Sequence, residues 1–137
     1  MQRQMLKSKI DGATITDCDV GYVGSITLDR ELMRQADLLF NEQVHVWDID
    51  NGARFVTYVI DGEAGSGTMQ VNGAAAHLTR PGHKIIVGSF GAYDEKDLET
   101  YSPVVVHVGE ENEIVAVDSH PEVLLAEPAH ASDAEMA

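Results

Sequence analysis

The sequence is short of cysteine and of basic residues, and each shortage excludes a class of protein. Cys18 is the single cysteine among 137 residues, so no internal disulfide and no cysteine metal cluster can form, and a reducing, cytoplasmic compartment is expected. Nine basic side chains stand against 23 acidic ones, a net charge of −14, which repels nucleic acids and anionic membranes. The first ten residues also lack the apolar block of a signal peptide or membrane span. We expect neither nucleic acid nor a membrane as a partner.

The acidic charge is concentrated toward the C-terminal end. Residues 94–137 carry 12 acidic and 1 basic side chain, against 11 and 8 in residues 1–93. The segment after Asp118 contains two prolines, several alanines and a single apolar cluster at residues 123–125, a composition typical of a solvated tail. We therefore predict one domain over residues 1–117 and an acidic, disordered tail over residues 118–137.

Most apolar runs are short, rich in β-branched residues and bounded by turn residues, which predicts an all-β protein. The clearest unit is a hairpin over residues 43–60, where Asn51-Gly52 favours a type I′ turn. Two short helices are expected, one from the N-cap Asp29 to Ala36 and one near residues 94–100. Further strands are expected at residues 5–16, 25–28, 68–72, 84–90 and 104–108.

A glycine followed by serine, Gly24-Ser25, stands just before an expected strand. A serine hydroxyl can attack the preceding carbonyl, because glycine has no Cβ to shield that carbonyl and tolerates strained dihedral angles. The peptide would become an ester, and elimination followed by hydrolysis would leave a pyruvoyl group at a new N-terminus. Gly65-Ser66 and Gly88-Ser89 present the same dipeptide, so the pair by itself favours an ordinary turn.

Arg54, Thr57 and Tyr58 lie on the strand that leaves the hairpin turn. Strand alternation places Arg54 and Tyr58 on one side and Thr57 on the other. An arginine binds a carboxylate through two parallel hydrogen bonds and a tyrosine hydroxyl donates a proton, so the pair suits an acidic substrate. The ordinary alternative is a solvent-facing arginine beside a half-buried tyrosine.

Small residues follow Asn72, namely Gly73, Ala74 and Ala75. Such a stretch brings backbone N–H groups within reach of a ligand, as an anion pocket or the start of a helix. A hairpin turn at Asn72-Gly73 is the alternative. By its pattern alone, Lys9 is an exposed strand lysine.

Metal ligation is not indicated, because the six histidines do not occur at metal-binding spacings. Pro81-Gly82-His83 before a strand suggests a cupin-like metal enzyme, but the paired histidines and the downstream glutamate of such a site are missing. Trp47, the single tryptophan, is predicted to pack in the core rather than to line a pocket.

Four motifs resemble the aspartate 1-decarboxylase family in their order and spacing. They are MLKSKI at residues 5–10, YVGS at 22–25, WDIDNGARFVTY at 47–58 and VNGAAAH at 71–77, and the resemblance spans residues 1–108. It implies a double-psi β-barrel that converts L-aspartate to β-alanine and CO2, which supplies a precursor of pantothenate and coenzyme A. It also implies self-cleavage between Gly24 and Ser25, a covalent pyruvoyl group derived from Ser25 rather than a metal or pyridoxal phosphate, and a homotetramer with shared active sites.

The resemblance implies a role for each candidate residue. Thr57 would position the Gly24 carbonyl for cleavage and later contact substrate, and Tyr58 would donate a proton. If both serve one site, a local distortion or a neighbouring subunit must overcome the alternation of the strand. The other implied contacts are carboxylate binding by Lys9 and Arg54, orientation by Asn72, and backbone contacts from Gly73, Ala74 and Ala75.

Two expectations concern the surroundings of the substrate. The leaving carboxylate should face an apolar wall, where losing its charge is favourable, and Ile86 is the candidate. Family members commonly carry a histidine and then a basic residue where this chain has Asp11-Gly12. We expect the added negative charge near Lys9 to weaken carboxylate binding or slow the cleavage, and a maturation factor is considered as a further partner.

The competing hypothesis is an uncleaved, non-catalytic β-barrel that acts as a binding or scaffold module. The sequence is that of the precursor in either case, so the presence of Ser25 does not separate the two hypotheses. The mass of the purified protein does, because only cleavage yields a fragment that ends at Gly24.

Overall fold

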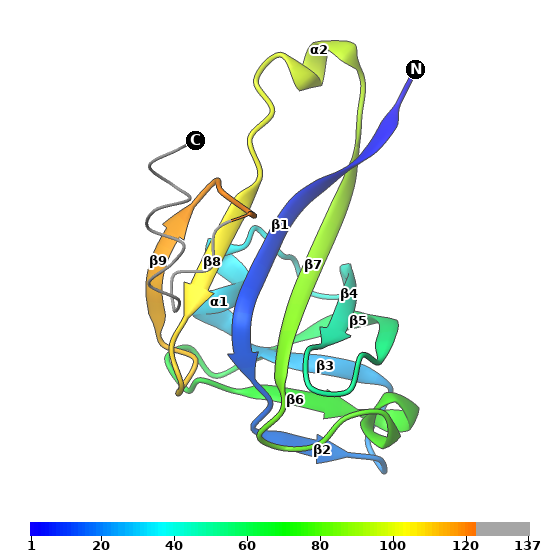
Figure 1. The fold of residues 1–137 in the computed structure, drawn as a ribbon. Helices are drawn as coiled ribbons and strands as arrows, with labels where there is room; N and C mark the ends of the chain where they lie inside the picture. Colours follow the sequence, from blue (N-terminus) through cyan, green and yellow to red (C-terminus); the bar gives the residue numbers. More distant parts are fainter. Residues whose placement is uncertain (123–137) are drawn as a thin grey trace.

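The computed structural model describes residues 1–122, in which nine strands form one continuous hydrogen-bonded sheet (Figure 1). Residues 123–137 lie outside the described part, and with them most of the tail predicted over residues 118–137. The strands are β1 (Arg3–Thr14), β2 (Asp17–Asp19), β3 (Ser25–Asp29), β4 (Gln43–Asp48), β5 (Arg54–Gly62), β6 (Met69–Asn72), β7 (Lys84–Tyr93), β8 (Val104–Val108) and β9 (Ile114–Asp118).

The sheet mixes parallel and antiparallel neighbours in the order β2-β6-β3-β5-β4-β7-β1-β8-β9. The parallel pairs are β1–β8, β2–β6 and β3–β5. The chain runs from β1 through Thr16 into β2, which lies at the far end of the strand order. The Thr16 backbone N–H donates to the Met69 carbonyl over 2.9 Å, and the Thr16 hydroxyl accepts from the Met69 N–H over 2.9 Å. The sheet therefore curls around one core, and the all-β barrel prediction is confirmed.

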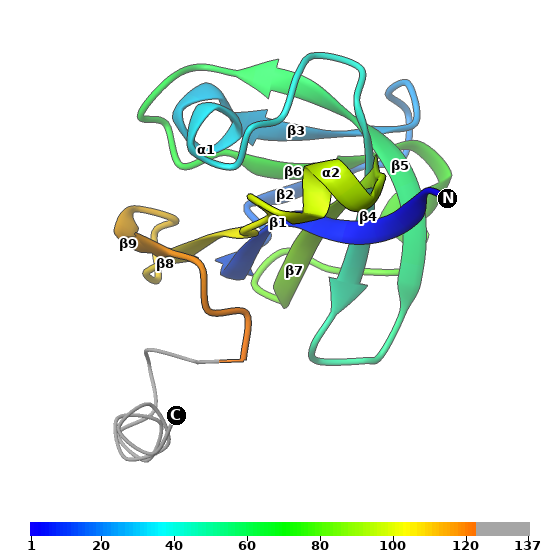
Figure 2. The same cartoon turned by 90° about the horizontal axis from the view of Figure 1, so that it is seen from above.

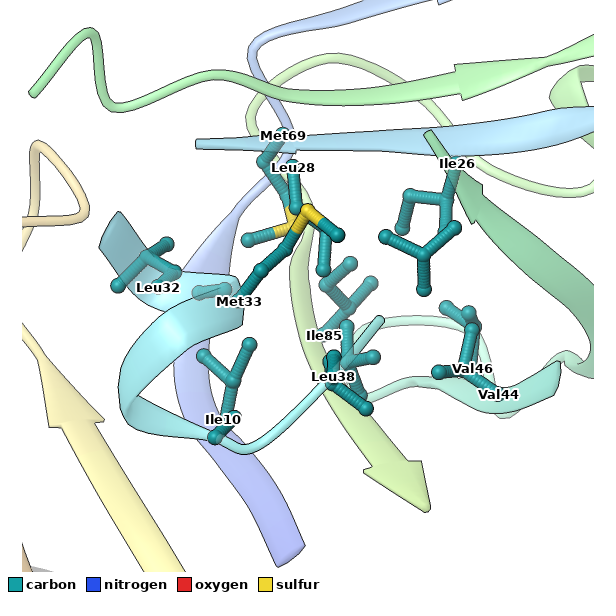
Figure 3. Close-up of a cluster of buried hydrophobic side chains, with 14 of the residues drawn as sticks. Ile10, Ile26, Leu28, Leu32, Met33, Leu38, Val44, Val46, Met69 and Ile85 are labelled. Carbon is teal, nitrogen blue, oxygen red and sulfur yellow. The ribbon is translucent and has the colours of Figure 1, made fainter. Parts of the chain in front are cut away.

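The core consists of β-branched, leucine and methionine side chains from most of the strands. Figure 3 shows Met33 of helix α1 (Arg30–Gln35) extending toward Leu28 and Met69 of the sheet. Each fully buried side chain of this size stabilises the fold by about 1.5–3 kcal/mol. The largest buried side chains are Ile10, Ile15, Ile26, Leu28, Leu32, Met69 and Ile85, with Val44, Val46, Val59, Val71 and Val87.

Both predicted α-helices are present and both are short. The Asp29 side chain caps α1 by accepting from the Glu31 N–H, and Figure 2 shows α1 beside β3. Helix α2 (Glu95–Leu98) begins with a capping box at Asp94 and lies at the far end of the β1–β7 ribbon (Figure 1). In residues 1–122 no helix is long and apolar enough to cross a membrane.

The hairpin predicted over residues 43–60 is confirmed, but the prediction of a type I′ turn is wrong. Gly52 has a positive φ of 78°, whereas Asn51 is not among the residues with positive φ. The Asp48 carboxylate accepts from the backbone N–H groups of Asp50 and Asn51, and the Gly52 N–H donates to the Asp48 carbonyl. These bonds close a longer loop, because a side-chain acceptor competes with the tight turn that Asn-Gly favours.

The prediction that Trp47 packs in the core is also wrong. Trp47 is half-buried, while its strand neighbours Val46 and Asp48 are 0% and 2% exposed. Successive strand residues point to opposite faces, so Trp47 lies on the outer face. There its ring lies near the rings of His45 and Phe90, with centroids 6.2 and 6.3 Å away.

Candidate active site

The Gly24-Ser25 junction lies where the chain enters β3, and its hydroxyl is held on two sides. Ser25 is 1% exposed. Its Oγ donates to the Val23 carbonyl over 2.8 Å and accepts from Asn72 Nδ2 over 3.0 Å. Asn72 is the register partner of Ser25 on β6, so the pairing of two strands brings the two side chains together.

The side chain of Asn72 is fixed by further hydrogen bonds. Its Nδ2 also donates to the Thr27 hydroxyl over 3.0 Å, and its Oδ1 accepts from Gln70 Nε2 over 2.8 Å. Asn72 is fully buried, so leaving any of these groups without a partner would cost free energy. Asn72 therefore presents an N–H to Ser25 in one orientation. The supporting residues Thr27 and Gln70 were not predicted, because neither stands in a recognisable motif.

Gly73 packs directly against Gly24. A Cβ on Gly73 would lie 2.5 Å from the Gly24 Cα and 2.8 Å from the Gly24 nitrogen, and Gly73 has a positive φ of 75°. Both conditions require glycine at this position. Residues Gly73–His77 form the 3-10 helix η1, which supports the helix-start interpretation and rules out the hairpin turn at Asn72-Gly73. Ala74 is exposed and Ala75 half-buried on this helix.

Four of the candidate side chains lie on the outer face of the sheet, namely Lys9, Ile86, Arg54 and Tyr58. In the strand registers, Trp47 is the partner of both Ile86 and Arg54. Gly88 is the partner of both Lys9 and His45. Tyr58 is the partner of Gln43. The residues that alternate with them, such as Val46 and Val87, belong to the core. One face of β1, β7, β4 and β5 therefore carries all four candidate side chains.

Arg54 is exposed, as the ordinary interpretation of this residue predicted. Its guanidinium lies 5.1 Å from the centroid of the Trp47 ring, a cation–π distance. Within residues 1–122 it forms no ion pair. The guanidinium is positioned by an aromatic ring and keeps its N–H groups available for an anion.

The strand β5 shows regular alternation at Thr57 and Tyr58. The β4–β5 register continues from Arg54 to Tyr58 without a shift, so a local distortion does not reconcile the two side chains. Both residues border one shallow hollow. The β3–β5 ladder begins at Ile26 and Val59, the residues that follow Ser25 and Tyr58. Tyr58 is thus brought to the same end of the ladder as Ser25.

Lys9 is more enclosed than its sequence pattern predicted, with a side chain only 14% exposed. Its Nζ donates to the Pro121 carbonyl over 2.8 Å and lies 3.8 Å from Asp11 Oδ2. The expected proximity of Asp11 to Lys9 is confirmed. The burial could not be read from the sequence, because Pro121 is 112 residues away along the chain.

The candidate residues thus form two groups. The junction group is Gly24, Ser25, Asn72 and Gly73, and the outer-face group is Lys9, Ile86, Arg54 and Tyr58. No hydrogen bond or ion pair joins the two groups within residues 1–122 of one chain.

Two other places in the molecule gather acidic side chains. Asp48, Asp50 and His83 bring ligand atoms within 4.8 Å of one another, but Asp48 is bonded to His83 over 2.7 Å and Asp50 accepts from the Lys84 N–H, so these groups close the hairpin loop. A hollow beside α1 contains no basic side chain, and it would repel an acidic substrate. Its acidic lining residues are Asp29, Glu31, Glu110, Glu111 and Glu113.

The fold and the junction group define a small all-β barrel protein built around a constrained glycine–serine junction. A family profile described as Aspartate decarboxylase matches residues 1–115. The aspartate 1-decarboxylase of Mycolicibacterium smegmatis is 53% identical over 121 residues, which cover 88% of this chain and 89% of that protein. That of Myxococcus xanthus is 47% identical over 115 residues, covering 84% and 88%. The chain belongs to the aspartate decarboxylase family, and the resemblance is confirmed.

Proposed function

We propose that this chain is a self-processing, pyruvoyl-dependent enzyme that converts L-aspartate to β-alanine and CO2. Membership of the decarboxylase family supports the reaction. The observation that carries the self-processing is the buried Ser25 hydroxyl, held by Asn72 at a junction where Gly73 packs against Gly24.

The self-cleavage needs no reagent other than water. The Ser25 hydroxyl attacks the Gly24 carbonyl, and the acyl group moves from nitrogen to oxygen, giving an ester and a free amine. Loss of the Ser25 Cα proton then expels the Gly24 carboxylate and leaves a dehydroalanine. Water adds to the imine tautomer of this residue and ammonia leaves, so the net change is one water consumed and one ammonia released.

The residues around position 25 fit a pyruvoyl group formed there. The Asn72 Nδ2 donor suits a carbonyl oxygen as well as a hydroxyl, and Gly73, Ala74 and Ala75 offer backbone contacts to the substrate, as the resemblance implies. When present, such a group supplies an electron sink for the electron pair released as CO2 departs. No diffusible cofactor is then needed.

The outer-face group supplies substrate recognition and a proton. Arg54 has N–H groups free for the retained β-carboxylate of aspartate, and Lys9 supports it. A buried charge without a partner is costly. A cation at this position therefore favours aspartate, which supplies a second carboxylate, over neutral amino acids, which do not. Ile86 provides an apolar wall for the carboxylate that leaves, Thr57 contacts the substrate, and Tyr58 protonates the α-carbon.

A neighbouring copy of the chain brings the two groups together in this proposal. The outer face carries partly exposed apolar side chains, with Val56 53% and Phe90 39% exposed beside the half-buried Trp47. Such a patch is typical of an interface. A homotetramer with shared active sites, as the resemblance implies, would cover this patch. A cytoplasmic location and a maturation factor complete the proposal.

The experiment compares the wild type with Ser25→Ala and with Ser66→Ala. Ser66 follows Gly65 in an exposed turn, so its replacement is a control for the loss of a glycine–serine hydroxyl. We expect the wild type and Ser66→Ala to migrate as two fragments and to release CO2 from aspartate, whereas Ser25→Ala remains one inactive chain. An active Ser25→Ala protein would refute the mechanism. An intact, inactive wild type would instead favour the uncleaved binding module.

A further inference from the structure

We propose that Asp11 is a positioning residue that sets the affinity for acidic ligands by competing with them for Lys9. This inference rests on the proposed function, in which Lys9 binds a carboxylate of the substrate.

Asp11 is a buried carboxylate with an incomplete set of partners. It lies on β1 and is 5% exposed. Its Oδ2 atom is buried and accepts no hydrogen bond from the described residues. A buried charge is costly unless another charge compensates it. The Lys9 ammonium lies 3.8 Å from this oxygen, beyond hydrogen-bond distance but close enough for strong attraction where water is largely excluded.

The other titratable groups near Asp11 are already engaged with each other. On the neighbouring strand β8, the register partner of Asp11 is His107, which is also 5% exposed. His107 Nε2 lies 3.0 Å from Asp118 Oδ2 on β9. On the other side, β7 contributes no register partner, because the β1–β7 pairing is interrupted between Ile10 and Ala13. Within residues 1–122, Asp11 therefore forms one ion pair, and its partner is Lys9.

Lys9 in turn is occupied by groups of its own chain. Its Nζ donates to the Pro121 carbonyl over 2.8 Å and faces the Asp11 carboxylate, and its side chain is only 14% exposed. A ligand carboxylate has the same chemistry as the Asp11 side chain, so it must share or displace this contact. Arg54 forms no ion pair with any of the described residues, and the effect of Asp11 therefore falls on the Lys9 contact.

The test removes the charge of Asp11 and keeps its shape. Succinate is the probe, because it carries two carboxylates and has no amine with which to react, and its binding is measured by calorimetry on the purified full chain. We expect Asp11→Asn to tighten succinate binding about fivefold, because one partly buried ion pair no longer competes with the ligand. The same substitution should lower KM for aspartate more than it changes kcat. Glu110→Gln is the matched control, because it removes one negative charge from an exposed partner of Lys84.

A second comparison shows whether Asp11 acts through Lys9. In a Lys9→Gln background, Asp11→Asn should leave succinate affinity unchanged, because the shared cation is gone. An equal gain with and without Lys9 would overturn the inference, as would unchanged or weaker succinate binding in Asp11→Asn alone. Asp11→Ala should act in the same direction and serves if the asparagine variant does not fold. A wild type that makes no β-alanine would refute the proposed function, while succinate binding would still decide the role of Asp11.

Discussion

At the scale of single residues, Gly73 determines how closely the chain packs at the Gly24-Ser25 junction. Its positive φ of 75° and the 2.5 Å that would separate its Cβ from the Gly24 Cα exclude any side chain. Asn72, the residue before it, holds the Ser25 hydroxyl. The two positions act together, since one fixes the backbone on which the other presents its amide.

We predict that Gly73→Ala displaces Gly24 and slows or abolishes the cleavage. Gly52→Ala is the control, because Gly52 has a similar φ of 78° but no atom within 4 Å of an added Cβ. Both variants should lose roughly 1 kcal/mol of stability from the left-handed backbone conformation, and only Gly73→Ala should accumulate the uncut chain. Fragment ratios on a gel and urea unfolding measure the two effects. Equal cleavage in both variants would show that the contact between the glycines is irrelevant.

At the scale of elements, the Asp29 side chain ties helix α1 to the loop before β6. Its Oδ1 accepts from the backbone N–H groups of Glu31 and Gly65, and its Oδ2 accepts from that of Gly67. Asp29 is 4% exposed, so three buried or partly buried N–H groups depend on one carboxylate. The cap thereby fixes the end of β3, the strand that begins at Ser25.

We predict that Asp29→Ala lowers the free energy of unfolding by about 2 kcal/mol, because the helix cap and the loop acceptors are lost together. Asp29→Asn should lose less, since it retains one acceptor oxygen. Urea unfolding followed by circular dichroism gives both values. If the alanine variant unfolded at the wild-type urea concentration, Asp29 would not join the helix to the loop.

The sequence predicts those elements whose determinants are local. The strands β1 and β3 to β8, the hairpin and the Asp29 cap follow from β-branched runs, turn residues and capping side chains, whereas β9 was not predicted. Strand β2, three residues long, has too few residues to show a pattern. The outer position of Trp47 was not predicted, because alternation alone does not say which face of β4 meets the core. The hairpin loop depends on the Asp48 carboxylate, which the Asn-Gly signal does not include.

The sequence likewise predicts one part of the candidate site and misses another. Ser25, Asn72 and Gly73 come together as the resemblance implied, because β3 pairs with β6 in the register that places Ser25 beside Asn72. The enclosure of Lys9 depends on Pro121 and could not be predicted, since no local pattern reports a contact so distant along the chain. The roles of Arg54, Thr57, Tyr58 and Ile86 stay predictions.

At the scale of the whole molecule, one chain holds two half-sites on different parts of a single barrel. The Gly24-Ser25 junction is built at β3, β6 and η1, and the cations lie on the outer face of β1, β7, β4 and β5. In the proposed function a second copy joins the two groups, and Thr57 positions the Gly24 carbonyl for the self-cleavage at the first group. The formation of the new N-terminus is therefore the central claim, and it can be tested without substrate.

The most direct measurement is the intact mass of the purified wild-type chain. The account predicts a fragment of residues 1–24 that ends in a free carboxylate, and a fragment beginning at position 25 that is lighter by one ammonia than a chain with an N-terminal serine. A single mass for the uncut chain in a preparation that produces β-alanine would contradict the account.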